Sequence, residues 1–238
     1  MTDSQYSPAR DQVRAMFSSI ASRYDLANSV LSFGLHHWWK RRLLAHLSEA
    51  QEGVVLDLCT GTADLIPLIS RRTSSQVVGV DFCLPMLRQG KGKLPAGTCL
   101  VHGDGLSLPI QSDSVTAVTV AFGVRNFEDL SAGLQEIRRV LVSGGRLLIL
   151  EFGQPQVAWW RSLYQFYSAH LLPRIGAMIT GNAFAYEYLP ETSAAFPCQE
   201  RFVQILAQEG FQEISYRSFL GGICYSYFAE KPSFEGEA

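Results

Sequence analysis

Short apolar runs alternate along the middle of the chain with stretches whose apolar residues recur every three or four positions. The first pattern predicts buried strands, and the second predicts helices with one face on a core. The predicted strands cover residues 54–58, 76–81, 98–101, 115–122 and 146–152. Helices are expected over residues 64–71, 85–94 and 130–141, the last one ended by Gly144 and Gly145. This order predicts an α/β, Rossmann-like fold whose mostly parallel sheet binds ligands beyond the carboxyl ends of its strands.

The N-terminal part of the chain is expected to be helical. Ser7 and Pro8 are typical of a helix start, because serine caps free N–H groups and proline suits the first turn. We expect that helix to reach about residue 21 and a second one to cover residues 37–48.

Aromatic residues are concentrated late in the chain, where residues 159–196 hold nine of the 27 aromatic side chains. Aromatic rings are ordinary core material, so this segment either packs an insertion onto the core or covers a flat, apolar substrate as a lid. The two interpretations are compatible.

The C-terminal part predicts a helix over residues 199–208 and extended segments over 211–219 and 223–230. A glycine pair separates the extended segments, which is typical of a hairpin, so we expect an antiparallel C-terminal edge of the sheet. Four regions result: an N-terminal helical cap (1–50), a Rossmann-like core (51–152), an aromatic-rich lid insertion (153–198), and a helix and hairpin that complete the core (199–238).

Composition narrows the class of protein. The 238 residues are 47% hydrophobic and 18% charged, enough for a substantial core and unlike a disordered chain. A net charge of -2 disfavours a nucleic-acid partner. No apolar run approaches the roughly 20 residues that span a bilayer. The five cysteines form no C-x-x-C pair, and no secretory leader opens the sequence, so we expect a cytoplasmic enzyme with reduced thiols.

The loop after the first predicted strand carries the most information about a ligand. It contains Asp57, Gly61 and Thr62, and its glycine lets a ligand approach the backbone beside free N–H groups of the following helix. Asp81 ends the next strand, where a carboxylate can accept both hydroxyls of a ribose. This arrangement suits either a dinucleotide or S-adenosylmethionine.

Three details favour S-adenosylmethionine. The loop has Cys59 and Asp64 where a dinucleotide fingerprint requires further glycines. The negative charges of Asp57 and Asp64 disfavour a pyrophosphate and suit a sulfonium cation. Asp104 follows the third strand and can contact an adenine amino group. A methyltransferase is therefore favoured, while a dinucleotide-dependent oxidoreductase and a non-catalytic cofactor-binding protein stay open.

Two strings resemble the signatures of the UbiE/MenG quinone C-methyltransferases: MFSSIASRYDLAN at residues 16–28 and AFGVRN at residues 121–126. The likeness extends over residues 13–231. It implies a class I methyltransferase that uses S-adenosylmethionine to methylate a ring carbon of a membrane-derived, prenylated quinol. The loop CTGT at residues 59–62 is more similar to the cyanobacterial and plant branch that makes phylloquinone than to many bacterial ubiquinone enzymes. The implied substrate is 2-phytyl-1,4-naphthoquinol or demethylmenaquinol, with a polyprenyl benzoquinol as the alternative.

The loop and the resemblance together assign the site residues. The cofactor is expected to contact Asp57, Gly61, Thr62, Asp81, Phe82, Asp104, Gly105 and Ala121. Many relatives have serine where this chain has Ala121, so a hydroxyl contact is lost there. The substrate is expected to contact Tyr24, Asp25, Phe122, Tyr164 and Tyr186. Tyr24 and Asp25 either cover the cofactor or simply start the next structural element.

Arg125 and Asn126 are the expected catalytic residues. Loss of a quinol hydroxyl proton pushes electron density onto the ortho carbon, so the enzyme must position the ring and stabilise a phenolate. We assign the electrostatic role to Arg125 and a hydrogen bond to the quinol oxygens to Asn126. Arg125 stays protonated, so it would lower the hydroxyl pKa or order a water. The alternative for Arg125 is a structural ion pair with Glu128 or Asp129.

A run of basic residues and the spacing of the histidines bear on membrane contact and on metal binding. The run Lys40-Arg41-Arg42 either forms a solvated helix face or meets anionic headgroups beside Trp38 and Trp39. A peripheral membrane contact and a homodimer are therefore left open. The histidines lack metal-ligand spacing beyond the adjacent pair His36 and His37, whose side chains should point apart, so no metal site is expected.

Overall fold

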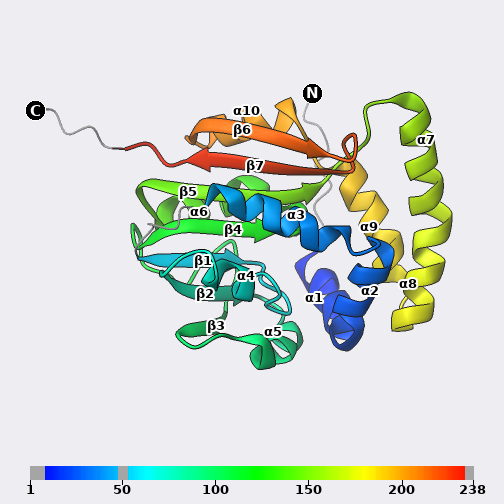
Figure 1. Cartoon of the computed structure of the whole chain (residues 1–238), viewed down its shortest axis with the longest axis horizontal. Coiled ribbons are helices and arrows are strands. Elements are labelled where there is room, and N and C mark those ends of the chain that lie inside the picture. Colours follow the sequence, from blue (N-terminus) through cyan, green and yellow to red (C-terminus); the bar gives the residue numbers. More distant parts are fainter. Residues whose placement is uncertain (1–8, 48–52, 234–238) are drawn as a thin grey trace, which may run out of the picture.

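The protein is described by a computed structural model over residues 9–47 and 53–233. Its strands form a seven-stranded sheet in the order β3-β2-β1-β4-β5-β7-β6 (Figure 1). The strands are β1 (Val54–Leu58), β2 (Gln76–Asp81), β3 (Thr98–His102), β4 (Val115–Ala121), β5 (Leu141–Phe152), β6 (Gln212–Phe219) and β7 (Cys224–Glu230). Strands β1 to β5 are parallel, and β7 is antiparallel to both of its neighbours. The predicted parallel sheet with an antiparallel C-terminal edge is confirmed.

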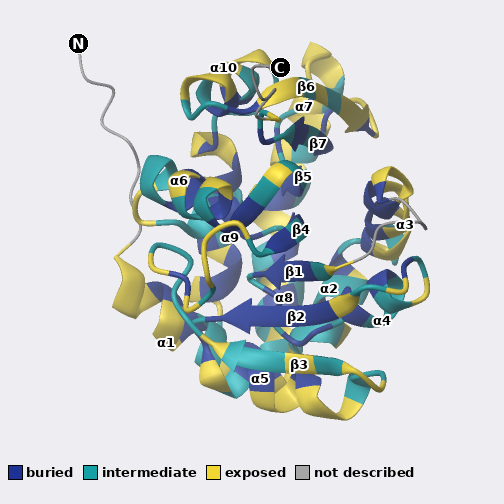
Figure 2. Cartoon of the chain, turned by 90° about the vertical axis from the view of Figure 1, so that its left-hand side faces the viewer, coloured by how far each residue is buried: buried dark blue, intermediate teal, exposed yellow. Residues whose placement is uncertain are grey.

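Helices cover both faces of this sheet, which leaves the central strands buried (Figure 2). They are α1 (Arg10–Ile20), η1 (Ala21–Arg23), α2 (Tyr24–Leu31), α3 (Leu35–Leu43), η2 (Leu44–His46), α4 (Ile66–Ser70), α5 (Leu84–Gly90), η3 (Lys91–Lys93), η4 (Val124–Asn126), α6 (Leu130–Val140), α7 (Ala158–Phe166), the π-helix η5 (Tyr167–Leu171), α8 (Leu172–Thr180), α9 (Phe184–Ala195) and α10 (Glu200–Gln208). Trp39 of α3 and Ile66 of α4 belong to the apolar cluster on one face. Leu134 of α6 and Phe202 of α10 belong to the cluster on the other face.

A third apolar cluster joins the two regions that the sequence describes as cap and lid. Met16 and Ile20 of α1 pack with Leu172 of α8 and Tyr188 of α9. These helices stand beside the carboxyl ends of the parallel strands (Figure 1). The helix α3 lies apart from them and packs on the sheet. The helices α1, α8 and α9 therefore form one layer over the edge where a ligand is expected.

Two expectations about elements need correction. The glycine pair 144–145 does not end α6, which stops at Val140 while Leu141 already begins β5. The pair lies in an irregular part of β5, where pairing with β4 passes from Leu141 to Arg146. The helix α2, which no apolar periodicity announced, begins at Tyr24. The expected cap at Ser7 and Pro8, the end of the second helix at residue 48, and the boundary between regions at residues 50 and 51 lie outside the described residues.

Across residues 9–47 and 53–233, no helix combines the length and the apolar character needed to cross a membrane.

Candidate active site

A pocket with an empty volume of about 330 Å³ lies at the carboxyl ends of β1, β2 and β4. It is lined by Phe17, Tyr24, Cys59, Gly61, Asp81, Met86, Ala121, Phe122, Gly123 and Asn126. Six of the residues that the sequence assigned to the site are therefore in its wall: Tyr24, Gly61, Asp81, Ala121, Phe122 and Asn126.

The loops after β1 and β4 touch at the floor of the pocket. A Cβ atom on Gly123 would lie 2.5 Å from the Cβ atom of Cys59, so only glycine fits there. Cys59 and Phe122 both have a positive φ, of 55° and 60°. The Phe122 N–H donates to the Leu150 carbonyl at 2.7 Å, which fixes this turn to β5. The turn at residues 122–123 therefore packs closely against the loop that follows β1.

Asp81 supplies the charge of the pocket. It is 7% exposed, and its two carboxylate oxygens accept the N–H groups of Gly61 and Cys83, each at 2.8 Å. Burial raises the pKa of Asp81 to about 6, although these two hydrogen bonds lower it. Each oxygen keeps a lone pair that can accept a ribose hydroxyl. Among the pocket-lining residues of the described chain Asp81 is the only charged one, which fits a cationic cofactor better than a pyrophosphate.

Asp57 lies beneath the loop and outside the pocket wall. It is 1% exposed and accepts hydrogen bonds from the hydroxyls of Thr60 at 2.6 Å and Thr119 at 2.7 Å. Burial raises its pKa to about 6, against the lowering effect of these hydroxyls. These hydrogen bonds hold the loop after β1 in place, so Asp57 supports that loop from below.

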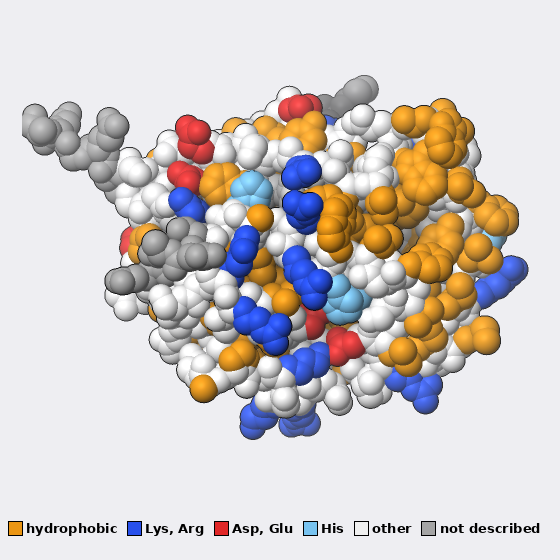
Figure 3. Space-filling view, viewed as in Figure 1, with side chains coloured by type: hydrophobic (Ala, Val, Ile, Leu, Met, Phe, Trp, Pro, Cys, Tyr) orange, Lys and Arg blue, Asp and Glu red, His pale blue; other side chains and the backbone are white. Residues whose placement is uncertain are grey.

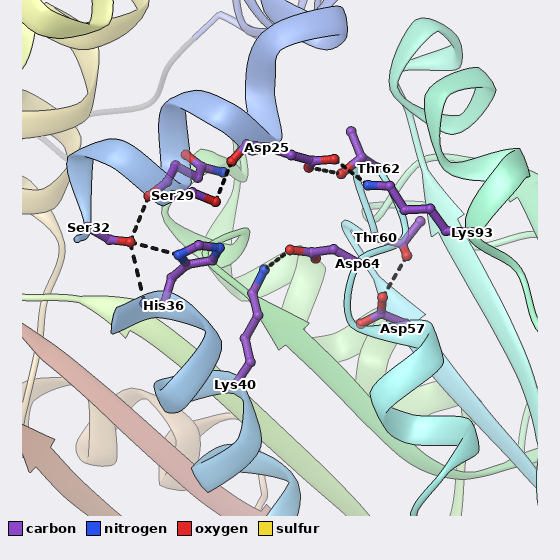
Figure 4. Close-up of polar contacts among 11 residues, drawn as sticks. Asp25, Ser29, Ser32, His36, Lys40, Asp57, Thr60, Thr62, Asp64 and Lys93 are labelled. Atoms are coloured by element: carbon purple, nitrogen blue, oxygen red, sulfur yellow. Dashed lines mark hydrogen bonds and ion pairs between the residues drawn. The ribbon is translucent and has the colours of Figure 1, made fainter. Parts of the chain in front are cut away.

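Polar contacts tie the N-terminal helices to the same loop (Figure 4). Asp25 of α2 accepts hydrogen bonds from the Thr62 hydroxyl and from the Lys93 ammonium. Lys40 of α3 pairs with Asp64 at 2.6 Å, and the Lys40 side chain is only 7% exposed. Two expectations therefore change: Lys40 does not belong to a solvated or headgroup-facing surface, and its ammonium offsets the loop charge that we ascribed to Asp64. Burial raises the pKa of Asp64, but Lys40 and Lys93 together leave it lowered overall.

Three other expected cofactor residues, Phe82, Asp104 and Gly105, are not among the residues that line the pocket. Asp104 pairs with Arg10 of α1 at 2.8 Å and accepts the Leu106 N–H at 3.0 Å. A Cβ atom on Gly105 would lie 3.0 Å from the Phe127 ring, so this turn also needs a small residue. Phe82 packs against the apolar cluster of cap and lid.

Arg125 forms a buried ion pair with Glu151 on the neighbouring strand β5. Its Nη1 lies 2.6 Å from Glu151 Oε1 and also donates to the Phe122 carbonyl at 2.7 Å. The side chains of Arg125 and Glu151 are 6% and 0% exposed. An ion pair is thus confirmed, but not with the expected partners, since Asp129 caps α6 by accepting the Ala132 N–H.

The Nε of the Arg125 guanidinium is buried and has no hydrogen-bond partner among the described residues. Arg125 itself is not among the residues that line the pocket, although Phe122 and Asn126 are. Burial lowers the Arg125 pKa, but Glu151 and Tyr24 together leave it raised overall, so the group stays protonated. The guanidinium can therefore donate hydrogen bonds and cannot act as a base.

Tyrosines surround Arg125 and Asn126. The Tyr188 hydroxyl donates to Asn126 Oδ1 at 3.0 Å and thereby fixes the orientation of the Asn126 side-chain amide. Burial raises the pKa of Tyr24 and of Tyr164 to about 12, and Arg125 is among the charges that act on both. Tyr186 lies elsewhere, because its ring packs on Gly176 between α8 and α9.

The adjacent histidines differ from the expectation. The ring centroids of His36 and His37 are 3.8 Å apart, so the side chains do not point apart. His36 shares a hydrogen bond of 2.7 Å with Ser32, and burial lowers its pKa to about 4. Across the described part of the chain, no group of three or more His, Cys, Asp or Glu could hold a metal ion.

Some residues of the site were missed at the sequence level. Glu151 is an acidic residue inside a predicted strand that is mostly apolar, and this contrast could have identified it as a candidate site residue. Phe17 and Gly123 lie inside the two quoted strings, and Met86 lies in the first turn after Asp81. Tyr188 carried no signal that separates it from the other aromatic residues of its segment.

The sheet order with a reversed β7, and a carboxylate-lined pocket at the ends of its central strands, define a Rossmann-like methyltransferase that uses S-adenosylmethionine. The fold is similar to that of an S-adenosylmethionine-dependent methyltransferase from Thermotoga maritima, with a TM-score of 0.66 at 15% identity over 91% of this chain and 98% of that one. Residues 4–231 match the model of the ubiE/COQ5 methyltransferase family, and the chain belongs to this family.

Two relatives match nearly the whole chain. A demethylmenaquinone methyltransferase of Deinococcus radiodurans is 44% identical over 92% of both chains. A ubiquinone/menaquinone biosynthesis C-methyltransferase of Bdellovibrio bacteriovorus is 38% identical over 94% of this chain and 97% of the relative. Because the chain belongs to this methyltransferase family, the alternatives of a dinucleotide-dependent oxidoreductase and of a non-catalytic cofactor-binding protein are rejected.

Proposed function

We propose that this protein transfers a methyl group from S-adenosylmethionine to a ring carbon of a prenylated naphthoquinol. One observation carries the proposal. A single pocket joins a wall suited to the cofactor, with Gly61 and Asp81, to an aromatic wall with Phe17, Tyr24 and Phe122. A flat ring bound against the second wall would lie next to a cofactor bound against the first.

The residues of the chain have distinct roles in this proposal. Gly61, Asp81 and Ala121 would hold the cofactor, which supplies an electrophilic methyl group when bound. Arg125 would donate its free Nε hydrogen to a quinol oxygen and stabilise the phenolate in a site shielded from water. Asn126, turned by Tyr188, would hold the quinol through its amide N–H.

The relatives support the class of ring. The names of both matched relatives refer to menaquinone precursors or menaquinone, and one also refers to ubiquinone. A naphthoquinol is therefore our primary proposal, as demethylmenaquinol or 2-phytyl-1,4-naphthoquinol, and a polyprenyl benzoquinol is the alternative. The branch that makes phylloquinone stays a prediction from the loop at residues 59–62.

A competition experiment tests the ring. Reduced naphthoquinol and benzoquinol with the same prenyl tail are offered together with S-adenosylmethionine, and both methylated products are quantified. We expect kcat/KM for the naphthoquinol to be at least tenfold higher. A preference for the benzoquinol would reject the ring assignment, and methylation of neither ring by a protein that binds the cofactor would reject the proposal.

A pair of variants tests the role of Arg125 without confusing it with folding. Arg125→Ala alone leaves Glu151 buried without a partner, so the double variant Arg125→Met with Glu151→Met is the better probe. We expect it to bind S-adenosylmethionine normally and to lose methyl transfer by about a hundredfold or more, the effect of removing one such donor. Near-normal turnover would show that Arg125 is only structural.

A further inference from the structure

The helix α7 has aromatic residues on two sides and a partner on only one. Trp160, Tyr164 and Tyr167 recur at helical spacing along its inner side and into η5. The Trp160 indole donates to the Leu220 carbonyl at 2.8 Å, and the Tyr167 hydroxyl donates to the Leu31 carbonyl at 2.8 Å. None of the nine residues of α7 is buried. The helix is therefore attached to the protein along one side and open along the other.

Large apolar side chains occupy the open side. Trp159, Leu163 and Phe166 recur at the spacing of one helix face and are 71%, 52% and 56% exposed. Burying such side chains in the protein would be the ordinary outcome, so three in one stripe indicate a surface that contacts an apolar partner.

A second stripe continues this surface on α2. Leu26 and Val30 lie one turn apart on α2, and Phe33 lies in the turn that follows the helix. All three are exposed, Phe33 by 79%. The Phe33 ring lies 6.3 Å from the ring of Tyr167, so the end of α2 adjoins η5. Met178 of α8 adds another exposed apolar side chain. Figure 3 shows apolar side chains gathered over the side of the molecule that α7, α8 and α2 form.

The charges of this side identify the partner. The segments of residues 26–47 and 152–186 contain no Asp or Glu, and the one carboxylate of α2, Asp25, is paired with Lys93. They do contain exposed cations, among them Arg42, which lies over the Trp38 ring at 5.5 Å, and Arg174 of α8. Lys and Arg side chains border the apolar surface on the side of α3 (Figure 3). An apolar face that is edged with cations, and whose one adjoining carboxylate is already paired, matches an anionic lipid surface.

We propose that the stripes of α7 and α2 form a docking face, made of Leu26, Val30, Phe33, Trp159, Leu163 and Phe166, that rests in the headgroup region of an anionic bilayer. The helix α2 reaches from this face to the pocket, because Phe33 just after its end packs on Tyr167 and Tyr24 at its start lines the pocket. A prenylated substrate could pass along α2 from the bilayer to the pocket. This last step rests on the proposed function, whereas the docking itself does not.

Vesicle co-sedimentation tests the docking face. Vesicles of phosphatidylcholine with phosphatidylglycerol are compared with vesicles of phosphatidylcholine alone. We expect binding to the anionic vesicles, weakened about tenfold or more by Trp159→Ser with Phe166→Ser and likewise by Leu26→Ser with Phe33→Ser. Arg42→Gln with Arg174→Gln should weaken it about fivefold for each charge removed. Leu84→Ser is the matched control, since Leu84 is 40% exposed on α5, and it should leave binding unchanged.

The outcomes separate this proposal from its rivals. Wild-type protein that stays in the supernatant, or equal binding of all variants, would overturn the docking face. A dimer that the stripe variants convert to a monomer would show instead that the face joins two copies of the chain. Methyl transfer to a tail-free, water-soluble naphthoquinol should be the same in wild type and stripe variants. Absence of that transfer in the wild type would count against the proposed function and leave the docking result standing.

Discussion

The substitution Glu151→Gln tests the buried ion pair behind the site. Glutamine has the shape of glutamate but no charge, so the Arg125 guanidinium would lose its counter-ion while both side chains stay almost fully buried. Removing one partner of such a pair destabilises a protein by about 3–5 kcal/mol. For a chain of this size that corresponds to a melting temperature lower by roughly 6–20 °C.

The matched control is the same substitution at Glu136, which pairs with Arg139 where the two side chains are 20% and 35% exposed. A pair on the surface contributes about 1 kcal/mol or less. Urea unfolding of Glu151→Gln, Glu136→Gln and the wild type at neutral pH without cofactor gives the three free energies. If the two variants unfold within about 1 kcal/mol of each other, the reasoning about burial of the Arg125 pair is refuted.

Other predictions concern the pocket and the N-terminal helices. Asp81 is a better acceptor when ionised, so calorimetry should show that S-adenosylmethionine affinity falls as pH drops through about 6, and Asp81→Asn should bind weakly without this step; a step that persists in the variant would contradict the assignment. Gly123→Ala should lower the free energy of unfolding by about 1–3 kcal/mol through overlap with Cys59, and Cys59→Gly should restore it; an unaffected single variant would disprove the close contact. His36 has a folded pKa of about 4, below its unfolded value, so between pH 6.5 and 4 the unfolded state binds a proton that the folded state does not. The free energy of unfolding should therefore decrease as the pH is lowered from 6.5 to 4, and His36→Gln should make this decrease smaller. Identical curves of stability against pH for the variant and the wild type would show that another group is responsible.

The strands could be predicted because each central strand of a parallel sheet is an uninterrupted apolar run. Residues 76–81 were predicted with the bounds that the structure shows. The glycine pair 144–145 misled the prediction, because a glycine pair ends a helix and opens an irregular stretch of strand by the same conformational freedom. The helix α2 was not predicted, because its position depends on contacts with distant parts of the chain. Asp25 accepts a hydrogen bond from Thr62, and the Leu31 carbonyl accepts one from Tyr167.

The site was predictable at strand ends and less so across strands. Asp81 and Ala121 end strands, and their place in the pocket follows from the parallel sheet. The partner of Arg125 was not predictable from neighbours in sequence, because Glu151 approaches it only through the pairing of β4 with β5. In the same way, Lys40 looked like a surface cation until the fold placed it against Asp64.

The central claim is that one pocket brings S-adenosylmethionine and a reduced quinone ring together for methylation at carbon. The most direct measurement supplies S-adenosylmethionine with a deuterated methyl group and a reduced prenylated naphthoquinol, and locates the label in the product by mass spectrometry and NMR. We predict a single labelled methyl group on a ring carbon, and none when the oxidised quinone is supplied. A label on a quinol oxygen, or an unlabelled quinol with the cofactor bound, would contradict the account.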